Sequence, residues 1–71
     1  MQETFIPASS NISQIDYDSD TQKLTVTFQD ARSYEYSGVP VTVFMGLQNA
    51  GRNVGSYFYR QVRTAYPYQE I

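Results

Sequence analysis

The sequence of 71 residues contains no cysteine, no histidine and no tryptophan. Without cysteine the chain has neither disulfides nor thiolate ligands, and without histidine it lacks the commonest metal ligand and general base. Its one lysine, Lys23, falls at the edge of a predicted strand, and no serine stands in a recognisable nucleophile motif. We therefore predict a protein that is not an enzyme, with no catalytic residue, no metal site and no cofactor.

Long apolar runs are also missing. No stretch approaches the roughly 20 apolar residues that a membrane-spanning helix needs, and the N-terminal residues lack the basic and apolar regions of a signal peptide. We therefore expect a cytoplasmic protein that makes no membrane contact. A chain this short forms one domain with a small core, and such domains often gain stability by self-association, so we expect a homo-oligomer.

Charge is scarce and unevenly distributed. The net charge is −2, which argues against a general nucleic-acid coat. Acidic residues outnumber basic ones in residues 1–51, whereas residues 52–71 hold Arg52, Arg60 and Arg63 against Glu70 alone. Aromatic residues are abundant, with seven tyrosines and four phenylalanines. Some of these rings must close the core, and the others are left as contact surface.

Apolar and polar residues alternate in the first half of the chain, and this alternation predicts strands. The clearest case is Lys23–Gln29, where leucine, valine and phenylalanine alternate with threonines. Similar patterns predict strands at Ser13–Tyr17 and Arg32–Ser37, and polar turns separate the three segments. We expect an antiparallel three-stranded meander with one apolar face, which needs a cover.

A helical pattern begins where the third predicted strand ends. Ser37-Gly38 supplies a turn-permissive corner, and Pro40 suits the start of a helix. Apolar residues then recur with helical spacing up to Ala50, just before Gly51. A second helix is predicted over Ser56–Ala65, ahead of a proline. The predicted fold class is therefore α+β: a three-stranded antiparallel β-meander covered by two C-terminal helices.

The two ends of the chain are predicted to lie outside the domain. Residues 1–9 are interpreted as an N-terminal arm, whose Phe5-Ile6 pair either docks on the core or meets a neighbouring subunit. Residues 10–68 form the single predicted domain, and residues 69–71 are predicted to be a tail.

A series of motifs along the chain resembles a known family. The matching residues, in order, are Ser10-Asn11-Ile12, Tyr17-Asp18, Leu24-x-Val26-x-Phe28, Tyr34-x-Tyr36, Val39-Pro40, Val43-Phe44, Leu47, Ala50, Gly55, Tyr57-Phe58, Val62-Arg63 and Tyr66-Pro67. Over about residues 9–68 the chain is similar to the KTSC domain, which occurs at the C-terminus of some lysyl-tRNA synthetases and as small stand-alone proteins of bacteria and phages.

This resemblance suggests an RNA-binding role, from the synthetase context. It also implies a bacterial cell as the location, or the host cytoplasm for a phage-encoded protein. Two features depart from the family pattern. The loop Gly51–Gly55 replaces the usual Ser-x-Gly approach to the second helix, and Tyr59 stands where the family usually has asparagine.

The best candidate site lies in the last third of the chain, where arginines and tyrosines are mixed. Guanidinium groups suit phosphate, and aromatic rings suit bases. Tyr59, Arg60 and Arg63 share the outward side of the second predicted helix. The alternative is a solvated helix face whose arginines pair with carboxylates. We predict a ligand-binding site made by Arg52, Tyr57, Tyr59, Arg60, Arg63 and Tyr66.

Three other features have simpler interpretations. Tyr34 and Tyr36 either stack on bases or, because they are in phase with the apolar face of the neighbouring strand, fill the core. The loop Gly51–Gly55 precedes a helix but matches no phosphate-binding fingerprint, which favours an ordinary connection. Asp16-x-Asp18-x-Asp20 lacks the glycine and the glutamate of a calcium loop and predicts a hairpin turn.

Two functions fit these observations. The first is a non-catalytic module that binds RNA or a nucleotide-like anionic ligand, which in a phage-borne protein would act by sequestering that ligand. The second is a protein-interaction or inhibitor module, which contacts a protein partner through exposed tyrosine and arginine side chains or through a sheet edge.

Overall fold

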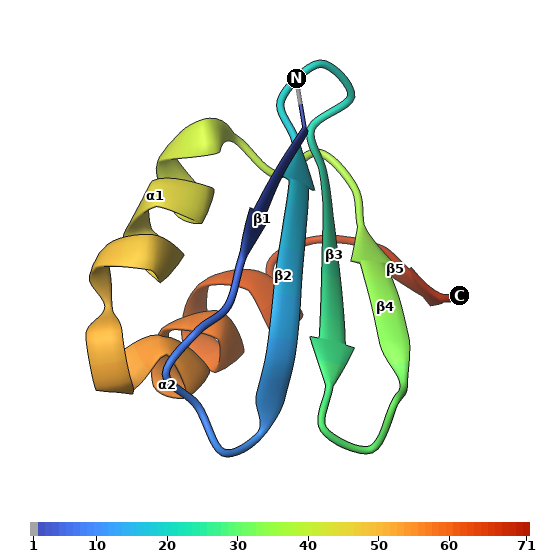
Figure 1. Ribbon diagram of the computed structural model, residues 1–71. Coiled ribbons are helices and arrows are strands. Elements are labelled where there is room, and N and C mark those ends of the chain that lie inside the picture. The colour runs from blue at the N-terminus through green and yellow to red at the C-terminus, as the bar shows by residue number, and fades with distance from the viewer. Residues whose placement is uncertain (1) are drawn as a thin grey trace.

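The computed structural model describes residues 2–71. Figure 1 shows an antiparallel sheet whose one face carries all the helical segments. In chain order the elements are β1 (Gln2–Phe5), β2 (Ile12–Asp18), β3 (Lys23–Phe28), β4 (Ser33–Tyr36), α1 (Val41–Asn49), a 3-10 turn η1 (Gly51–Asn53), α2 (Val54–Phe58), a π-helical turn η2 (Tyr59–Arg63) and β5 (Tyr68–Glu70). This order confirms the predicted α+β class.

The sheet has five strands in the order β1-β2-β3-β4-β5, and every neighbouring pair is antiparallel. Its central strands β2, β3 and β4 are the predicted meander. Val26 stands opposite Ile15 on one side and Tyr34 on the other, so the apolar positions fall in one cross-strand row. The sheet is wider than the three strands predicted, because β1 and β5 add one strand at each edge.

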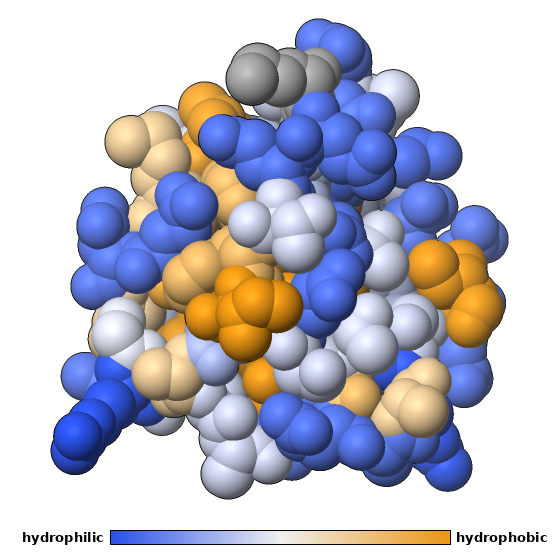
Figure 2. Space-filling view, viewed as in Figure 1, coloured by the Kyte–Doolittle hydropathy of each residue, from blue (hydrophilic) through white to orange (hydrophobic). Residues whose placement is uncertain are grey.

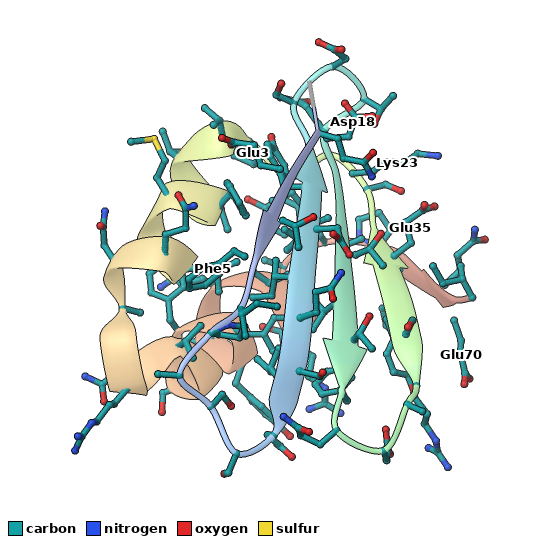
Figure 3. All side chains as sticks on the ribbon, in the orientation of Figure 1. Glu3, Phe5, Asp18, Lys23, Glu35 and Glu70 are labelled. Atoms are coloured by element: carbon teal, nitrogen blue, oxygen red, sulfur yellow. The ribbon has the colours of Figure 1, made fainter. Side chains whose placement is uncertain are left out.

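The two edge strands come from the segments that the sequence predicted to be an arm and a tail. Gln2, Glu3 and Thr4 are exposed and only Phe5 of β1 is half-buried, while all of β5 is exposed. Neither segment therefore shows an alternating pattern. Phe5 packs against the core, which is one of the two alternatives expected for it, and Figure 3 shows its ring on the helix side of the sheet.

Glycine and proline shape the connection into α1. Gly38 has a φ of +74°, which side chains with a Cβ rarely adopt, and it turns the chain away from β4. Pro40 stands in extended conformation immediately before the first residue of α1. The helix ends as predicted, since Gly51 follows Ala50 with a φ of +59°.

The second helical segment begins at Val54 rather than Ser56 and ends at Arg63 rather than Ala65. Its inward side buries Val54, Phe58 and Val62. On the side facing α1, a Cβ added at Gly46 would overlap the hydroxyl and Cζ of Tyr57. The glycine thus lets the Tyr57 ring lie directly on the α1 backbone.

The core fills the space between the helical segments and the inner face of the sheet. Tyr17 is its largest buried side chain, and its hydroxyl donates a hydrogen bond of 2.6 Å to the carbonyl of Val39. The ring of Tyr17 stacks on Phe44 with the centroids 4.9 Å apart. The buried apolar residues are Ile12, Ile15, Tyr17, Leu24, Val26, Tyr36, Val39, Phe44, Leu47, Val54, Phe58 and Val62.

The two faces of the molecule differ in character. On the outer face of the sheet, Figure 3 shows Asp18, Lys23 and Glu35 directed away from the helices. Over α1, Figure 2 shows apolar side chains at the surface, where Val41 and Met45 are exposed. Within residues 2–71, no helix is long and apolar enough to cross a membrane.

Candidate functional site

Five aromatic rings form a closed circuit between the sheet and α2. Each ring contacts the next, with centroid separations between 5.5 and 5.8 Å. Most of these contacts are edge-to-face, the arrangement that aromatic quadrupoles favour. The circuit combines one ring from β3, two from β4, one from α2 and one from β5, and in order it runs Phe28, Tyr34, Tyr68, Tyr36 and Phe58.

A cleft of about 300 Å³ opens over this circuit. That volume stands at the lower end of the range for small-ligand sites. All five rings line the cleft. Polar groups stand around it on two sides: Tyr59 and Arg63 on the helical side, and Asn11, Asp30 and Arg32 on the loop side. We call this site the aromatic cleft.

Tyr36 is a nearly buried residue that lines the aromatic cleft. Only 3% of this residue is exposed, yet its hydroxyl has no hydrogen-bond partner among residues 2–71. Every fully enclosed side-chain nitrogen or oxygen in that part of the chain has a partner, so the Tyr36 hydroxyl retains some contact with solvent. Because Tyr36 lines the cleft, a ligand atom that replaced this solvent could accept the hydrogen bond.

Electrostatics keep this hydroxyl protonated. Burial raises the pKa of Tyr36 above 10.0, the nearby Arg63 guanidinium lowers that pKa in part, and Tyr68 and Tyr34 raise it. At neutral pH Tyr36 is therefore a hydrogen-bond donor, with a cation close by. A donor beside a cation favours an anionic oxygen as its partner.

Arg63 and Tyr59 form the helical rim of the cleft. The guanidinium carbon of Arg63 lies 4.5 Å from the centroid of the Tyr59 ring, in cation–π geometry. Tyr59 is 57% exposed, and Arg63 is exposed as well. Among residues 2–71 no carboxylate forms an ion pair with Arg63. Its charge is therefore held in place by a ring and left uncompensated.

Arg60 belongs to a second surface feature that also includes Tyr59. The two residues share a shallow groove with Asn53 and Ser56. The Nε of Arg60 donates a hydrogen bond of 3.4 Å to the backbone carbonyl of Ser56, which draws the side chain along the helix. Arg60 also lacks an ion pair with any carboxylate of the described chain. We call this second site the Arg60 groove.

The loop side of the cleft is nearly neutral. The Nε of Arg32 lies 3.7 Å from a carboxylate oxygen of Asp30, and both side chains are mostly exposed. The Asp30 carboxylate also accepts a hydrogen bond of 3.1 Å from the backbone N–H of Arg32, which closes the β3–β4 turn. An exposed pair of this kind stabilises little, so its main effect is to offset the Arg32 charge.

The structure brings together three of the six predicted site residues: Tyr59, Arg60 and Arg63. The other three lie elsewhere. Tyr57 is half-buried against Gly46 of α1, Tyr66 is half-buried against the core, and Arg52 is exposed on η1, outside both the cleft and the groove.

Several residues of the cleft were not predicted as site residues. For Tyr34 and Tyr36 the sequence left core packing and base stacking as alternatives, and in the structure both pack in or against the core and also line the cleft. Arg32 and Tyr68 come from a turn and from the last strand, and nothing in their local sequence indicates that they meet α2. The one available signal was their chemistry, an arginine and a tyrosine beside segments already rich in rings.

The carboxylates of Asp16 and Asp18, both in β2, accept hydrogen bonds from within the chain. The Asp16 carboxylate accepts hydrogen bonds from the Thr4 hydroxyl at 2.7 Å and from the Gln14 amide at 2.9 Å. Asp18 accepts one from the backbone N–H of Asp20 at 3.0 Å, inside the turn between β2 and β3. The hairpin-turn interpretation of these aspartates is confirmed.

Comparison with known proteins gives consistent matches. The family model described as the KTSC domain matches residues 8–66. A crystal structure of a KTSC domain protein from Yersinia pestis superposes with a TM-score of 0.89 at 25% identity, and the match covers 100% of this chain and 99% of that one.

Two curated lysine–tRNA ligases also match this chain. The protein from Trichormus variabilis is 37% identical and the one from Nostoc sp. is 35% identical, each over 65 residues and 92% of this chain. The aligned part is only 11% of the length of either ligase. The family model covers most of the chain, and this match shows that the chain belongs to the KTSC domain family.

Proposed function

We propose that this chain is a non-catalytic module that binds RNA, or a nucleotide-like anion, in the aromatic cleft. The Arg63 guanidinium would hold a phosphate oxygen, and the Tyr36 hydroxyl would donate a hydrogen bond to the same group or to its neighbour. The rings of the cleft would stack on a base. RNA is the favoured ligand because the curated relatives are named as lysine–tRNA ligases.

The observation that carries the proposal is the position of Arg63. Its guanidinium lies over Tyr59 and has no carboxylate partner among the described residues, and it stands close enough to Tyr36 to lower the pKa of that hydroxyl. An arginine side chain on a protein surface usually forms an ion pair with a carboxylate or extends into water. Here a ring holds the cation at the mouth of an aromatic site, which suits a ligand that is both planar and anionic.

The chemistry of the cleft favours binding over catalysis. Its lining offers rings, an amide, two arginines and one carboxylate, and that carboxylate is exposed and already pairs with Arg32. The raised pKa of Tyr36 keeps this hydroxyl protonated at neutral pH, so it is a poor general base.

A fluorescence-anisotropy titration with a labelled hexauridylate tests the proposal. Arg63→Ala should weaken binding about tenfold or more, because a charge-assisted hydrogen bond to phosphate is lost. Arg52→Ala is the matched control, since it removes the same charge from an exposed site outside the cleft. Equal losses in the two variants, or no binding by the unaltered protein, would refute the proposal.

A second candidate function is a protein contact, either with a partner or between copies of this chain. Among residues 2–71, the outer edges of β1 and β5 have no neighbouring strand, and such edges can accept another strand. Capture from a lysate with and without nuclease separates the two functions. A protein that stays bound after nuclease treatment favours the contact function, and loss of the bound material favours RNA.

A further inference from the structure

We propose that Tyr59 joins the aromatic cleft and the Arg60 groove into one continuous track, so that the ligand is a single RNA strand of several nucleotides rather than one free nucleotide. This inference rests on the proposed function, because it concerns the same cleft. It adds a second site, the Arg60 groove, and assigns Arg60 a separate phosphate.

The track follows from the position of Tyr59. This residue lines both the aromatic cleft and the Arg60 groove, and among residues 2–71 no other residue is shared by the two. Tyr59 is 57% exposed, with Arg63 beside it in the cleft lining and Arg60 beside it in the groove lining. A ring at the junction of two sites is placed to stack on a base while the backbone continues past it.

The charge distribution supports a ligand with more than one phosphate. Neither Arg60 nor Arg63 has a carboxylate partner within residues 2–71, although acidic residues are the more numerous in the chain as a whole. Both side chains are held, Arg63 by the Tyr59 ring and Arg60 by the Ser56 carbonyl. Two uncompensated cations that each share a site with the same ring suit a ligand in which phosphates and bases alternate, as they do along a single strand.

A free nucleotide would use only part of this surface. The aromatic cleft of about 300 Å³ stands at the lower end of the range for small-ligand sites, which favours one base and its phosphate over a longer ligand inside it. A second nucleotide must then leave the cleft, and the groove that continues from Tyr59 holds Arg60, Asn53 and Ser56 at its surface. The groove therefore offers a cation and hydrogen-bonding groups where the next phosphate would pass.

The experiment compares ligands of different length. Uridine monophosphate, diuridylate and hexauridylate are titrated as competitors of a labelled hexauridylate. We expect affinity to rise at least tenfold from the monophosphate to the hexamer. Arg60→Ala should weaken hexauridylate about tenfold and leave the monophosphate unchanged, whereas Arg63→Ala should weaken both. Arg52→Ala is the charge-matched control and should leave all three ligands unchanged.

Salt dependence gives a second reading of the same contact. For a single strand, each phosphate neutralised by the protein steepens the slope of log affinity against log salt by about 0.7. Arg60→Ala should lower the slope for hexauridylate by about that amount. Arg60 is exposed, so we expect the variant to keep the unfolding midpoint of the parent. An unchanged midpoint would show that the smaller salt slope comes from the lost phosphate contact and not from unfolding.

The outcomes separate the track from the proposed function. If the monophosphate binds as tightly as the hexamer, or if Arg60→Ala affects both equally, the track is refuted and the cleft stands as a nucleotide site. If neither ligand binds, the proposed function itself fails. Equal affinity for hexathymidylate would overturn the assignment to RNA. A protein that displaces hexauridylate from the parent, and whose own binding is lost in Arg60→Ala, would overturn the track.

Discussion

Replacing Gly46 with alanine should destabilise the protein, although alanine is the better helix former. In the middle of α1 this change alone would stabilise by about 1 kcal/mol. The added Cβ, however, would overlap the hydroxyl and Cζ of Tyr57. Forcing a packed ring to move costs about 1–3 kcal/mol. We therefore expect a net loss of about 1 kcal/mol.

A second substitution reverses the sign. Leucine at position 57 lacks both overlapping atoms of the tyrosine and keeps an apolar side chain at the helix contact. In the Tyr57→Leu background, Gly46→Ala should therefore stabilise by up to about 1 kcal/mol, from helix propensity alone. The coupling between the two positions is then about 2 kcal/mol, within the range seen for residues in direct contact.

Urea unfolding of the four proteins, followed by far-UV circular dichroism, measures this coupling. If the free energy of unfolding depends on urea concentration with the same slope in all four proteins, the substitutions act on stability and not on the compactness of the unfolded chain. An equal change in the free energy of unfolding for Gly46→Ala in both backgrounds would contradict this prediction. RNA binding by the Tyr57→Leu protein should match the parent, because Tyr57 lies outside the cleft and the groove.

Four further predictions concern the tyrosines. Tyr17→Phe should cost about 1–3 kcal/mol in urea unfolding, because the buried Val39 carbonyl loses its donor; an unchanged midpoint would contradict this. Burial raises the pKa values of Tyr17 and Tyr36 above 10.0. Their contribution to the free energy of unfolding should therefore be fully present below pH 10.0 and be lost as the pH rises through the folded-state pKa values. At alkaline pH the urea unfolding midpoint should decline less in Tyr17→Phe than in the parent. Tyr36→Phe should keep the fold and weaken hexauridylate several-fold, and equal affinity would mean that the hydroxyl contacts no ligand. Tyr68→Ala should also weaken hexauridylate, by about 1–3 kcal/mol if its ring stacks on a base, whereas loss of the fold's circular dichroism would assign this ring to the core instead.

The central fold could be predicted because its signals are local. The alternation in β3 and the glycine and proline at the β4–α1 corner each act within a few residues. β1 and β5 escaped prediction for the opposite reason. Their residues are nearly all exposed, so no apolar pattern marks them, and their pairing is backbone hydrogen bonding to β2 and β4.

The placement of three predicted site residues on one side of a helix could be read from the sequence for a similar reason. Tyr59, Arg60 and Arg63 share one side of a helix, and helical periodicity is readable in a sequence. Tyr57 was assigned to the same site by composition alone. It lies only two residues before Tyr59, but two residues turn an α-helix by more than half a circle, and Tyr57 faces α1 instead.

The aromatic cleft shows why the alternative between core and surface is incomplete for a tyrosine. The Tyr36 ring packs edge-to-face on Phe58 and closes the core, and the same residue lines the cleft. Tyr68 completes the circuit, and it does so because β5 pairs with β4. A ligand that contacts Tyr68 binds only the state in which β5 is docked, so by mass action it must also stabilise that short exposed strand. For the proposed ligand, binding and the docking of β5 are therefore expected to be linked equilibria, each of which strengthens the other.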